Sequence, residues 1–280
     1  EDSVSNYEQP PRATHGRIAQ DVSLPSPSES LLREVAQVLS RARRVLVITG
    51  AGLSADSGMP TYRGIGGLYE SDMTEDQVAI ETALSGTMLR ARPELTWKYL
   101  LQIEAACRGA KPNAGHRALA QMEGLFRSFT VLTQNIDGFH TQAGHRAVIE
   151  IHGNMRTLFC TECHRQWQVE NYAGLTLPPR CEDCRGPVRP RVVLFGEALP
   201  APALQQLDRT LTQGVDAVIS IGTTAVFPYI ASPVVNAARI GVPTIEINPG
   251  TSEISEIVKY RIPERAAQVL PVLLEHLWRS

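Results

Sequence analysis

The 280-residue sequence is short of aromatic side chains, of net charge and of long apolar runs, and each shortage excludes a class of protein. Only 6% of the residues are aromatic while 43% are hydrophobic, which indicates the aliphatic core of an α/β protein. A formal charge of −2 gives no indication of a general nucleic-acid-binding surface. No apolar run approaches the roughly eighteen residues of a transmembrane helix, so we predict no contact with the membrane interior.

The N-terminal segment lacks the signature of a secretory signal, because no basic region followed by an apolar stretch is present. Residues 1–28 instead hold four prolines among Ser, Asp, Glu and Gln residues. Such a segment buries too little apolar area to offset the entropy lost on ordering. We therefore predict a disordered tail over 1–28.

Four of the five cysteines form two Cys-x2-Cys pairs that are separated by seventeen residues. The spacing of Cys160, Cys163, Cys181 and Cys184 predicts a closed, tetrahedral zinc site that stabilises the fold and leaves the chemistry to other residues. A disulfide pair and a redox Cys-x-x-Cys are the alternatives. Thiolate ligands fit a reducing compartment, so we expect a cytoplasmic protein. Cys107 lies far from the cluster in the sequence and is expected to be an inert buried thiol.

Short apolar runs alternate with helical patterns along most of the chain. The runs predict strands at 45–49, 129–133, 147–151, 192–195, 217–221 and 244–247, and helices are expected from about residue 31 and near 114–125, 201–212, 229–240 and 265–278. This alternation predicts an α/β fold with a Rossmann-like, doubly wound parallel sheet. Two stretches interrupt the alternation, and we assign 65–112 and 155–190 to a smaller helical and zinc-binding module. The larger, Rossmann-like domain is then expected to comprise 29–64, 113–154 and 191–280.

The first apolar run leads directly into Gly50-Ala51-Gly52-Leu53-Ser54-Ala55. This pattern matches the turn that brings backbone amides close to a pyrophosphate at a helix N-terminus. A simple tight turn is the alternative. The second strand of an ordinary dehydrogenase, which ends in an acidic residue, is missing, and the glycine-rich segment 57–68 stands in its place.

Polar residues follow several of the other predicted strands. They are Gln134, Asn135 and Asp137 after one strand, His152 after the next, and Gly222, Thr223, Thr224 and Asn248 after two more. Ligands of open α/β sheets bind at the carboxyl edge, where these positions converge. Taken singly, Asn135 or Asn248 could cap a turn, and His152 could be a hydrogen-bonded core residue.

In combination, these motifs resemble those of the sirtuins, NAD-dependent protein-lysine deacylases. The resemblance rests on Gly50-Ala51-Gly52-x-Ser54, Ser57-Gly58-x-Pro60-x-Tyr62-Arg63, Thr133-Gln134-Asn135-Ile136-Asp137, His152-Gly153, the four cysteines, Val193-x-Phe195-Gly196-Glu197, Gly222-Thr223-Thr224 and Asn248. The motifs occur in the family's order over about residues 34–278. Tyr62 and Thr224 replace the family's common Phe and Ser, and both changes preserve size or polarity.

The resemblance implies which residues bind NAD and which act in catalysis. The implied NAD-binding residues are Gly50, Ala51, Gly52, Ser54, Tyr62, Arg63, Gln134, Asn135, Asp137, Gly222, Thr223, Thr224, Asn248 and Ala266. Asn135 and Asp137 are expected at the nicotinamide end, Asn248 and Thr223 at the adenosine ribose, and Ala266 near the adenine. His152 is the implied general base on a ribose hydroxyl, and Asn135 is also assigned to catalysis. The implied products are nicotinamide, free lysine and O-acyl-ADP-ribose, and no net hydride transfer takes place.

The family also implies how an acylated-lysine protein or peptide binds. The peptide would add as a strand between two extended edges that contain Val193, Phe195, Gly196, Glu197 and Val226. Simple core packing is the alternative for Phe195. Relatives that remove acidic acyl groups carry a Tyr-x-x-Arg pair, which aligns here with Leu100 and Ile103. Neither can bind a carboxylate, so we expect acidic acyl groups to be disfavoured.

Two other functions fit parts of the sequence. A protein ADP-ribosyltransferase would use the same scaffold, and its product would be an ADP-ribosylated protein. A non-catalytic NAD sensor or zinc-containing binding module would bind NAD without releasing nicotinamide. We favour a monomer, although nothing in the sequence determines the oligomeric state.

Overall fold

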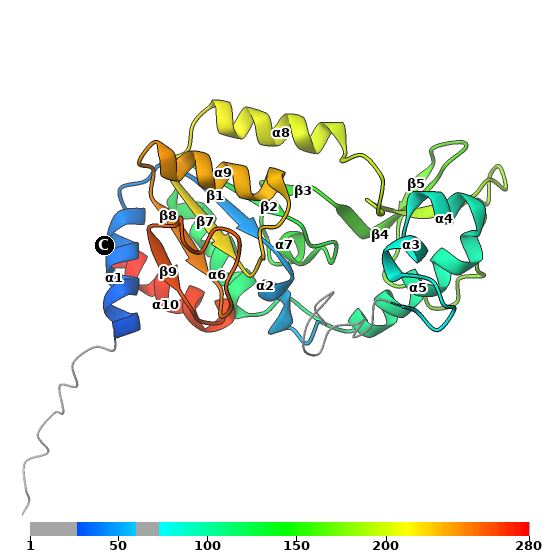
Figure 1. Ribbon diagram of the computed structural model, residues 1–280, viewed down its shortest axis with the longest axis horizontal. Coiled ribbons are helices and arrows are strands. Elements are labelled where there is room, and N and C mark those ends of the chain that lie inside the picture. Colours follow the sequence, from blue (N-terminus) through cyan, green and yellow to red (C-terminus); the bar gives the residue numbers. More distant parts are fainter. Residues whose placement is uncertain (1–26, 60–72, 280) are drawn as a thin grey trace, which may run out of the picture.

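The structure is a computed structural model that describes residues 27–59 and 73–279. It has two lobes, a large one built around a parallel sheet and a small one that contains α3, α4, α5 and β5 (Figure 1). Most of the predicted tail lies outside the described residues, and α1 (Pro27–Leu39) begins at its end. Tyr62 and Arg63, both predicted to bind NAD, also lie outside the described residues.

The large lobe is organised around a six-stranded sheet in the order β3-β2-β1-β7-β8-β9. Every neighbouring pair is parallel. The strands are β1 (Arg44–Thr49), β2 (Ser128–Thr133), β3 (Val148–Glu150), β7 (Ala217–Ile221), β8 (Thr244–Ile247) and β9 (Tyr260–Ile262). The sheet confirms the predicted doubly wound fold, because the chain extends from β1 to β2 and β3 on one side and to β7, β8 and β9 on the other.

Helices cover both faces of this sheet, which explains why its central strands are apolar on both sides. Val45 and Val47 face a core formed with α1, α6 (Ala114–Met122) and α10 (Ala266–Trp278). Leu46 and Ile48 face the opposite core, which α8 (Ala201–Thr212) and α9 (Pro228–Arg239) complete. The shorter elements of this lobe are α2 (Ala51–Ala55), the 3-10 helix η1 (Glu123–Leu125) and α7 (Phe139–Gln142).

A third core lies in the small lobe. Three helices, α3 (Ile80–Ala83), α4 (Gly86–Ala91) and α5 (Pro93–Cys107), pack beside a three-stranded antiparallel sheet in the order β5-β4-β6. Its strands are β4 (Gly153–Cys160), β5 (Gln166–Gln168) and β6 (Val188–Val192). The residues of this core come almost entirely from the two stretches that the sequence assigns to the small module. The domain boundaries themselves stay a prediction.

One predicted strand is wrong. The apolar run 192–195 is not part of the parallel sheet, because β6 ends at Val192 and pairs antiparallel with β4. Beyond it, Phe195 forms an isolated bridge with Ser85. Val192 and Leu194 are apolar because they are buried in the core of the small lobe. An apolar run shows that a segment is buried but not against which sheet it packs.

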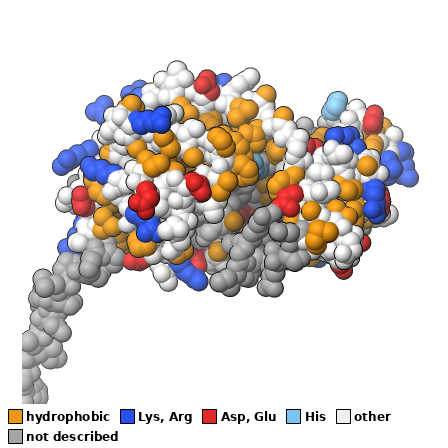
Figure 2. Space-filling model, in the orientation of Figure 1, with side chains coloured by type: hydrophobic (Ala, Val, Ile, Leu, Met, Phe, Trp, Pro, Cys, Tyr) orange, Lys and Arg blue, Asp and Glu red, His pale blue; other side chains and the backbone are white. Residues whose placement is uncertain are grey.

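None of the helices within residues 27–59 and 73–279 combines the length and the apolar character needed to cross a membrane. On the face drawn in Figure 2, basic and acidic side chains are interspersed over both lobes. This arrangement agrees with the small net charge of the sequence.

Candidate active site

The carboxyl ends of β1 and β7 lie side by side where the order of the strands reverses. β1 continues through Gly50 into α2, the strand–turn–helix arrangement that the glycine motif predicts. The amide of Gly52 donates to the carbonyl oxygen of Gly222 at 2.8 Å, and a Cβ on Gly52 would lie 2.7 Å from the Gly222 Cα. Gly222 has a φ of +58°, in the left-handed region that favours glycine. Both residues must be glycine because two backbone turns touch here.

Backbone hydrogen bonds within this turn occupy amides that the motif was expected to offer to a pyrophosphate. The amides of Gly50, Gly52 and Leu53 donate to the carbonyl oxygens of Ile221, Gly222 and Gly50. Three amides that the motif would offer to a pyrophosphate therefore hold the turn in place instead. The side chains around the turn are the groups that we expect to contact a dinucleotide.

Amide and hydroxyl groups from three strand ends form one network beside this turn. Gln134, after β2, donates from Nε2 to Thr223 Oγ1 at 2.8 Å. Asn248, after β8, donates from Nδ2 to the carbonyl oxygen of Thr223 at 3.0 Å. Thr223 is buried, whereas Thr224 is exposed. The predicted convergence of these strand ends is confirmed, and such donors and acceptors suit the hydroxyl groups of a ribose.

A second network joins α2 to the segment after β2. Asn135 Nδ2 donates to Ser54 Oγ at 3.2 Å, and Ser54 Oγ donates to Asp137 Oδ2 at 2.7 Å. Burial raises the pKa of Asp137 above its ordinary value. His116 Nε2 lies 3.5 Å from the same serine oxygen, and burial lowers the pKa of His116 to about 4. The structure thus brings Ser54, Asn135 and Asp137 together and adds a neutral imidazole beside them.

His152 follows β3 and is hydrogen-bonded at both ring nitrogens. Nδ1 lies 3.0 Å from the carbonyl oxygen of Gln134, which can only accept, so we assign the ring proton to Nδ1. Nε2 then carries the lone pair and accepts a hydrogen bond from Tyr229 Oη at 2.7 Å. Burial lowers the pKa of His152, although the bond to Gln134 opposes this effect. The imidazole is therefore neutral at neutral pH, with Nε2 able to accept a proton.

An exposed aromatic ring packs against His152, and two more exposed apolar side chains lie on the predicted substrate segments. The Phe227 ring packs edge-on against the imidazole with centroids 6.0 Å apart, and it stacks on the Tyr229 ring at 5.4 Å. Phe195, Val226 and Phe227 are 40%, 62% and 44% exposed. The exposure of Phe195 contradicts the alternative that it is a simple core residue. Exposed apolar groups beside a base suit a long, largely aliphatic substrate side chain.

Backbone hydrogen bonds fix the segment 193–197. The amide of Val193 donates to the His152 carbonyl oxygen at 2.9 Å. The amide of Phe195 donates to the carbonyl oxygen of Leu84 at 3.0 Å, and its own carbonyl oxygen accepts from the Gly86 amide at 3.1 Å. Both backbone groups of Phe195 are thus engaged with the small lobe. A peptide that adds as a strand must pair with other residues of the segment.

Glu197 shapes the same segment through an ion pair. Arg189 donates from both terminal nitrogens to the two Glu197 oxygens, at 2.6 and 2.8 Å, and the amide of Leu194 donates to Glu197 at 2.9 Å. Partial burial acts to raise the pKa of Glu197, but Arg189 and the Leu194 amide outweigh it, so the pKa lies below its ordinary value. Glu197 is therefore ionised and holds the predicted substrate segment in shape.

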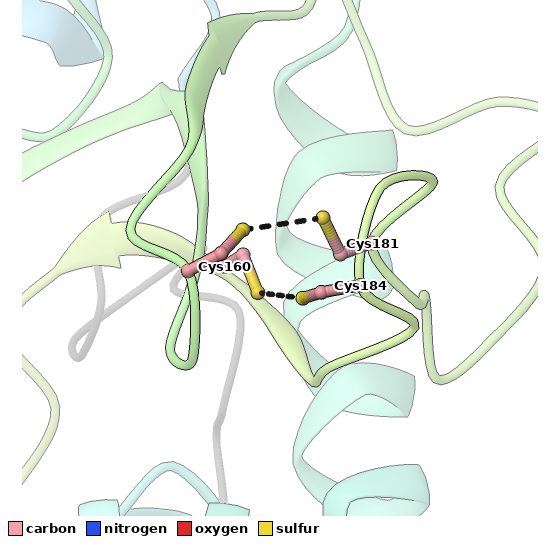
Figure 3. A group of neighbouring side chains, drawn as sticks. Cys160, Cys181 and Cys184 are labelled. Atoms are coloured by element: carbon pink, nitrogen blue, oxygen red, sulfur yellow. Dashed lines mark hydrogen bonds between the residues drawn. The ribbon is translucent and has the colours of Figure 1, made fainter.

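The four paired cysteines meet between β4 and the loop before β6 (Figure 3). Their sulfur atoms all lie within 4.8 Å of one another, with Cys160 and Cys184 3.4 Å apart and Cys163 and Cys181 3.7 Å apart. Zinc–sulfur bonds of about 2.3 Å in a tetrahedron place the sulfurs about 3.8 Å apart. A disulfide would need about 2.05 Å. The donor set therefore fits a four-thiolate zinc ion, and the disulfide alternative is wrong.

Backbone amides complete the cysteine site. The amide of Glu162 points at Cys160 Sγ and the amide of Gly186 at Cys184 Sγ, each at 3.4 Å. Such hydrogen bonds stabilise the negative charge of thiolate ligands. Cys107 is separate from this group and only partly buried, where the sequence predicted a buried thiol, and desolvation raises the pKa of the thiol to about 11. This shift agrees with the prediction that Cys107 is inert.

Sequence reasoning missed several residues that shape the site. Tyr229 and Phe227 follow the Gly222–Thr224 motif by a few residues, so their nearness to a strand end was an available signal. His116 and Arg189 gave no such signal, because their partners lie on other elements. Ala266 is 3% exposed within the core against α1 and α6, and its predicted place near the adenine stays a prediction.

Comparison with known proteins places this geometry in a family. Residues 50–228, which include the glycine turn, His152 and all four paired cysteines, match the model of the Sir2 family. The chain belongs to the Sir2 family. It is 51% identical over 255 residues to NAD-dependent protein deacylase 2 of Pseudomonas aeruginosa, covering 90% of this chain and 99% of the relative. It is also 36% identical to the NAD-dependent protein deacylase of Aquifex aeolicus, covering 83% of this chain and 95% of the relative.

Solved Sir2 structures share the fold. A Sir2 homologue in complex with NAD has a TM-score of 0.77 and 31% identity, covering 88% of this chain and 93% of that chain. A Sir2 variant in complex with 2′-O-acetyl ADP ribose has a TM-score of 0.78 and 32% identity, covering 88% and 96%. NAD and structural zinc are therefore the cofactors of this Sir2 chain, in agreement with the strand-end network and the cysteine cluster.

Proposed function

We propose that this chain is an NAD-dependent protein-lysine deacylase that converts NAD and an acylated lysine into nicotinamide, free lysine and O-acyl-ADP-ribose. The observation that carries the proposal is the neutral His152, fixed at Nδ1 by Gln134 and placed beside the dinucleotide-type turn. The names of the relatives, NAD-dependent protein deacylases, support it. The first test is whether an acetyl-lysine peptide is deacetylated only when NAD is present.

The reaction joins three substrates, because one water molecule is needed to balance the products. The acyl oxygen replaces nicotinamide on the ribose. The acyl carbon moves from the lysine nitrogen to a ribose hydroxyl and takes up the oxygen of water, and the lysine leaves with a proton. In this proposal His152 Nε2 takes the proton of the ribose hydroxyl. Asn135 and Asp137 line the nicotinamide end, and Gln134, Thr223 and Asn248 hold the ribose of the adenosine side through amide and hydroxyl groups.

The acylated peptide is proposed to bind along the exposed segments near His152. Phe195, Val226 and Phe227 would form the walls of the acyl-lysine channel, and the segment 193–197 would receive the peptide backbone. A solved Sir2 variant holds a deacetylated p53 peptide with 3′-O-acetyl ADP ribose, at 27% identity and a TM-score of 0.75. By analogy, the partners of this chain are acylated-lysine proteins or peptides. We also propose a cytoplasmic location, which agrees with the zinc thiolates, and a monomeric state.

An ADP-ribosyltransferase remains the competing activity on this scaffold. The presence of a base at Nε2 of His152 favours the deacylase, because acyl transfer to a ribose hydroxyl needs that hydroxyl to lose its proton. Transfer of ADP-ribose to a protein would instead leave the acyl group on lysine. The mass of the acyl-bearing product separates the two activities.

Tyr229 is expected to orient the base and to tune its proton affinity. Its hydroxyl donates to the atom of His152 that accepts the proton, and this bond favours the neutral imidazole. Tyr229→Phe is therefore expected to raise the pKa of His152, so that the acid limb of the kcat/KM profile moves to higher pH. We expect kcat to fall about fivefold, the effect of one hydrogen bond, with the KM for NAD unchanged. An acid limb that does not move would contradict the assignment of the proton to Nδ1.

Acidic acyl groups are expected to be poor substrates. Leu100 is 2% exposed, and Ile103 packs against the same core of the small lobe, so neither position offers a group that pairs with a carboxylate. Burying an unpaired carboxylate is costly, and we expect kcat/KM for a succinyl-lysine peptide to be at least about tenfold lower than for its butyryl-lysine counterpart. The two acyl groups have the same chain length and differ in charge. Equal kcat/KM values would contradict this prediction.

A further inference from the structure

A cavity of about 420 Å³ lies between the small lobe and the predicted substrate segment. Its walls come from α4, β4, β6 and the residues that follow β6. Val193, Gly196 and Glu197 belong both to this wall and to the predicted peptide-binding segment. The cavity therefore adjoins the place where a substrate peptide is expected. No step of the proposed reaction uses this cavity.

Three arginines and one glutamate are the charged residues of the lining, so its formal charge is positive. Arg189 is neutralised by its two-pronged bond to Glu197, and both side chains are largely buried, at 12% and 20% exposure. Arg191 binds the neutral Gln166 Oε1 at 2.6 Å. Arg90 makes no hydrogen bond or ion pair within residues 27–59 and 73–279, but its charge is near enough to help lower the pKa of Glu197. Two guanidinium groups thus line the cavity without a direct ion pair to a carboxylate of the described residues.

Given the proposed deacylase function, we propose that this cavity binds a carboxylate side chain of the substrate, an Asp or Glu that flanks the acylated lysine. Arg90, on α4, and Arg191, on β6, line the same cavity, so a carboxylate bound there is attracted by both guanidinium groups. Glu197 is bound directly by Arg189 and acts on Arg90 only at longer range, so the three arginines leave the lining with an excess of positive charge. Such a cavity would give the enzyme a preference for certain peptide sequences, because its other contacts with the peptide are expected to be backbone hydrogen bonds.

The distance along a peptide is compatible with this role. An extended peptide rises about 3.3 Å per residue, and its successive side chains point to opposite faces. Val193 connects the two places, since it lines the cavity and its amide donates to the His152 carbonyl oxygen at 2.9 Å. A carboxylate within a few positions of the acylated lysine can therefore reach the cavity while the lysine side chain reaches His152.

The test compares acetyl-lysine peptides of one length with glutamine at every flanking position and peptides with a single glutamate at one flanking position. Both the Kd of the labelled peptide and kcat/KM are measured, at low and at high salt. We expect glutamate at one or two positions to improve both constants about fivefold at low salt, with the gain reduced at high salt. Equal constants for glutamate and glutamine at every position would overturn the proposal.

Arginine variants test whether the preference for glutamate arises from the cavity. In Arg90→Gln/Arg191→Gln we expect the ratio of the glutamate to the glutamine peptide, measured on the same protein, to fall to about one. The matched control Arg209→Gln, on the exposed surface of α8, should keep the ratio of the unmodified chain. A ratio that survives in the double variant would overturn the proposal. So would a preference for succinyl-lysine that the double variant loses, because the arginines would then bind the acyl group.

The two measurements also separate this inference from the function on which it rests. A glutamate preference in Kd that depends on Arg90 and Arg191, without turnover of any peptide, would support the cavity and contradict the deacylase. Turnover without any preference in Kd or kcat/KM would support the deacylase and contradict the cavity.

Discussion

Cys160→Ala is expected to release zinc and to unfold the small lobe. The variant keeps three thiolates of a four-sulfur site whose atoms all lie within 4.8 Å of one another. Cys160 is also fully buried beside the core of the small lobe, so the metal site and that core depend on each other. Structural zinc contributes on the order of 10 kcal/mol to the folding of small modules. We expect loss of bound zinc in elemental analysis and loss of most soluble protein.

The matched control for this experiment is Cys107→Ala. Cys107 lies at the end of α5, outside the cluster, so its removal should leave one zinc ion per chain and normal solubility. A strong chelator should reproduce the effect of Cys160→Ala in the unmodified chain and in the control. A soluble, fully active Cys160→Ala protein would show that the cluster is not a structural zinc site.

His152→Ala is expected to lower kcat by about 10²–10⁴-fold, the range that general base catalysis contributes. The substitution removes Nε2 and the bond to the Gln134 carbonyl oxygen, but it leaves the side-chain hydrogen bonds that join Gln134, Thr223 and Asn248. Binding of NAD should therefore change little, which calorimetry with the variant would measure. A loss of activity that follows from a loss of NAD binding would mean that His152 is a structural residue.

The control for this variant is His276→Gln near the end of α10, a helix that packs against α1 and α6. It should keep full activity. Residual activity in His152→Ala within about fivefold of the unmodified chain would contradict the role of the imidazole as the base, since other bases rarely replace a positioned histidine at so small a loss.

Sequence patterns predicted the parts of this molecule that depend on local chemistry. The apolar runs located β1, β2, β7 and β8 because strands buried on both faces are continuously apolar. The spacing of the four cysteines located the zinc site because ligand geometry restricts the turns between them. His152 and Asn248 were found because polar residues after buried strands gather at one edge of a parallel sheet.

The features that sequence missed depend on partners far apart in the chain. β9 is a three-residue edge strand with the polar Arg261 at its centre, too short to show a pattern. The run 192–195 was assigned to the wrong sheet because hydrophobicity does not specify a packing partner. The contact between Tyr229 and His152 joins residues that β4, β5, β6, α8 and β7 separate in the chain. These tertiary contacts needed the structure.

The measurement that tests the central proposal most directly is a mass-resolved reaction of an acetyl-lysine peptide with NAD. The account predicts equal amounts of deacetylated peptide, nicotinamide and O-acetyl-ADP-ribose, with all three lost in His152→Ala. NAD consumption with the acetyl group still on lysine, or with ADP-ribose attached to protein, would contradict the deacylase and favour the transferase. NAD binding without nicotinamide release for any acyl-lysine peptide would show that the chain is a sensor and not an enzyme.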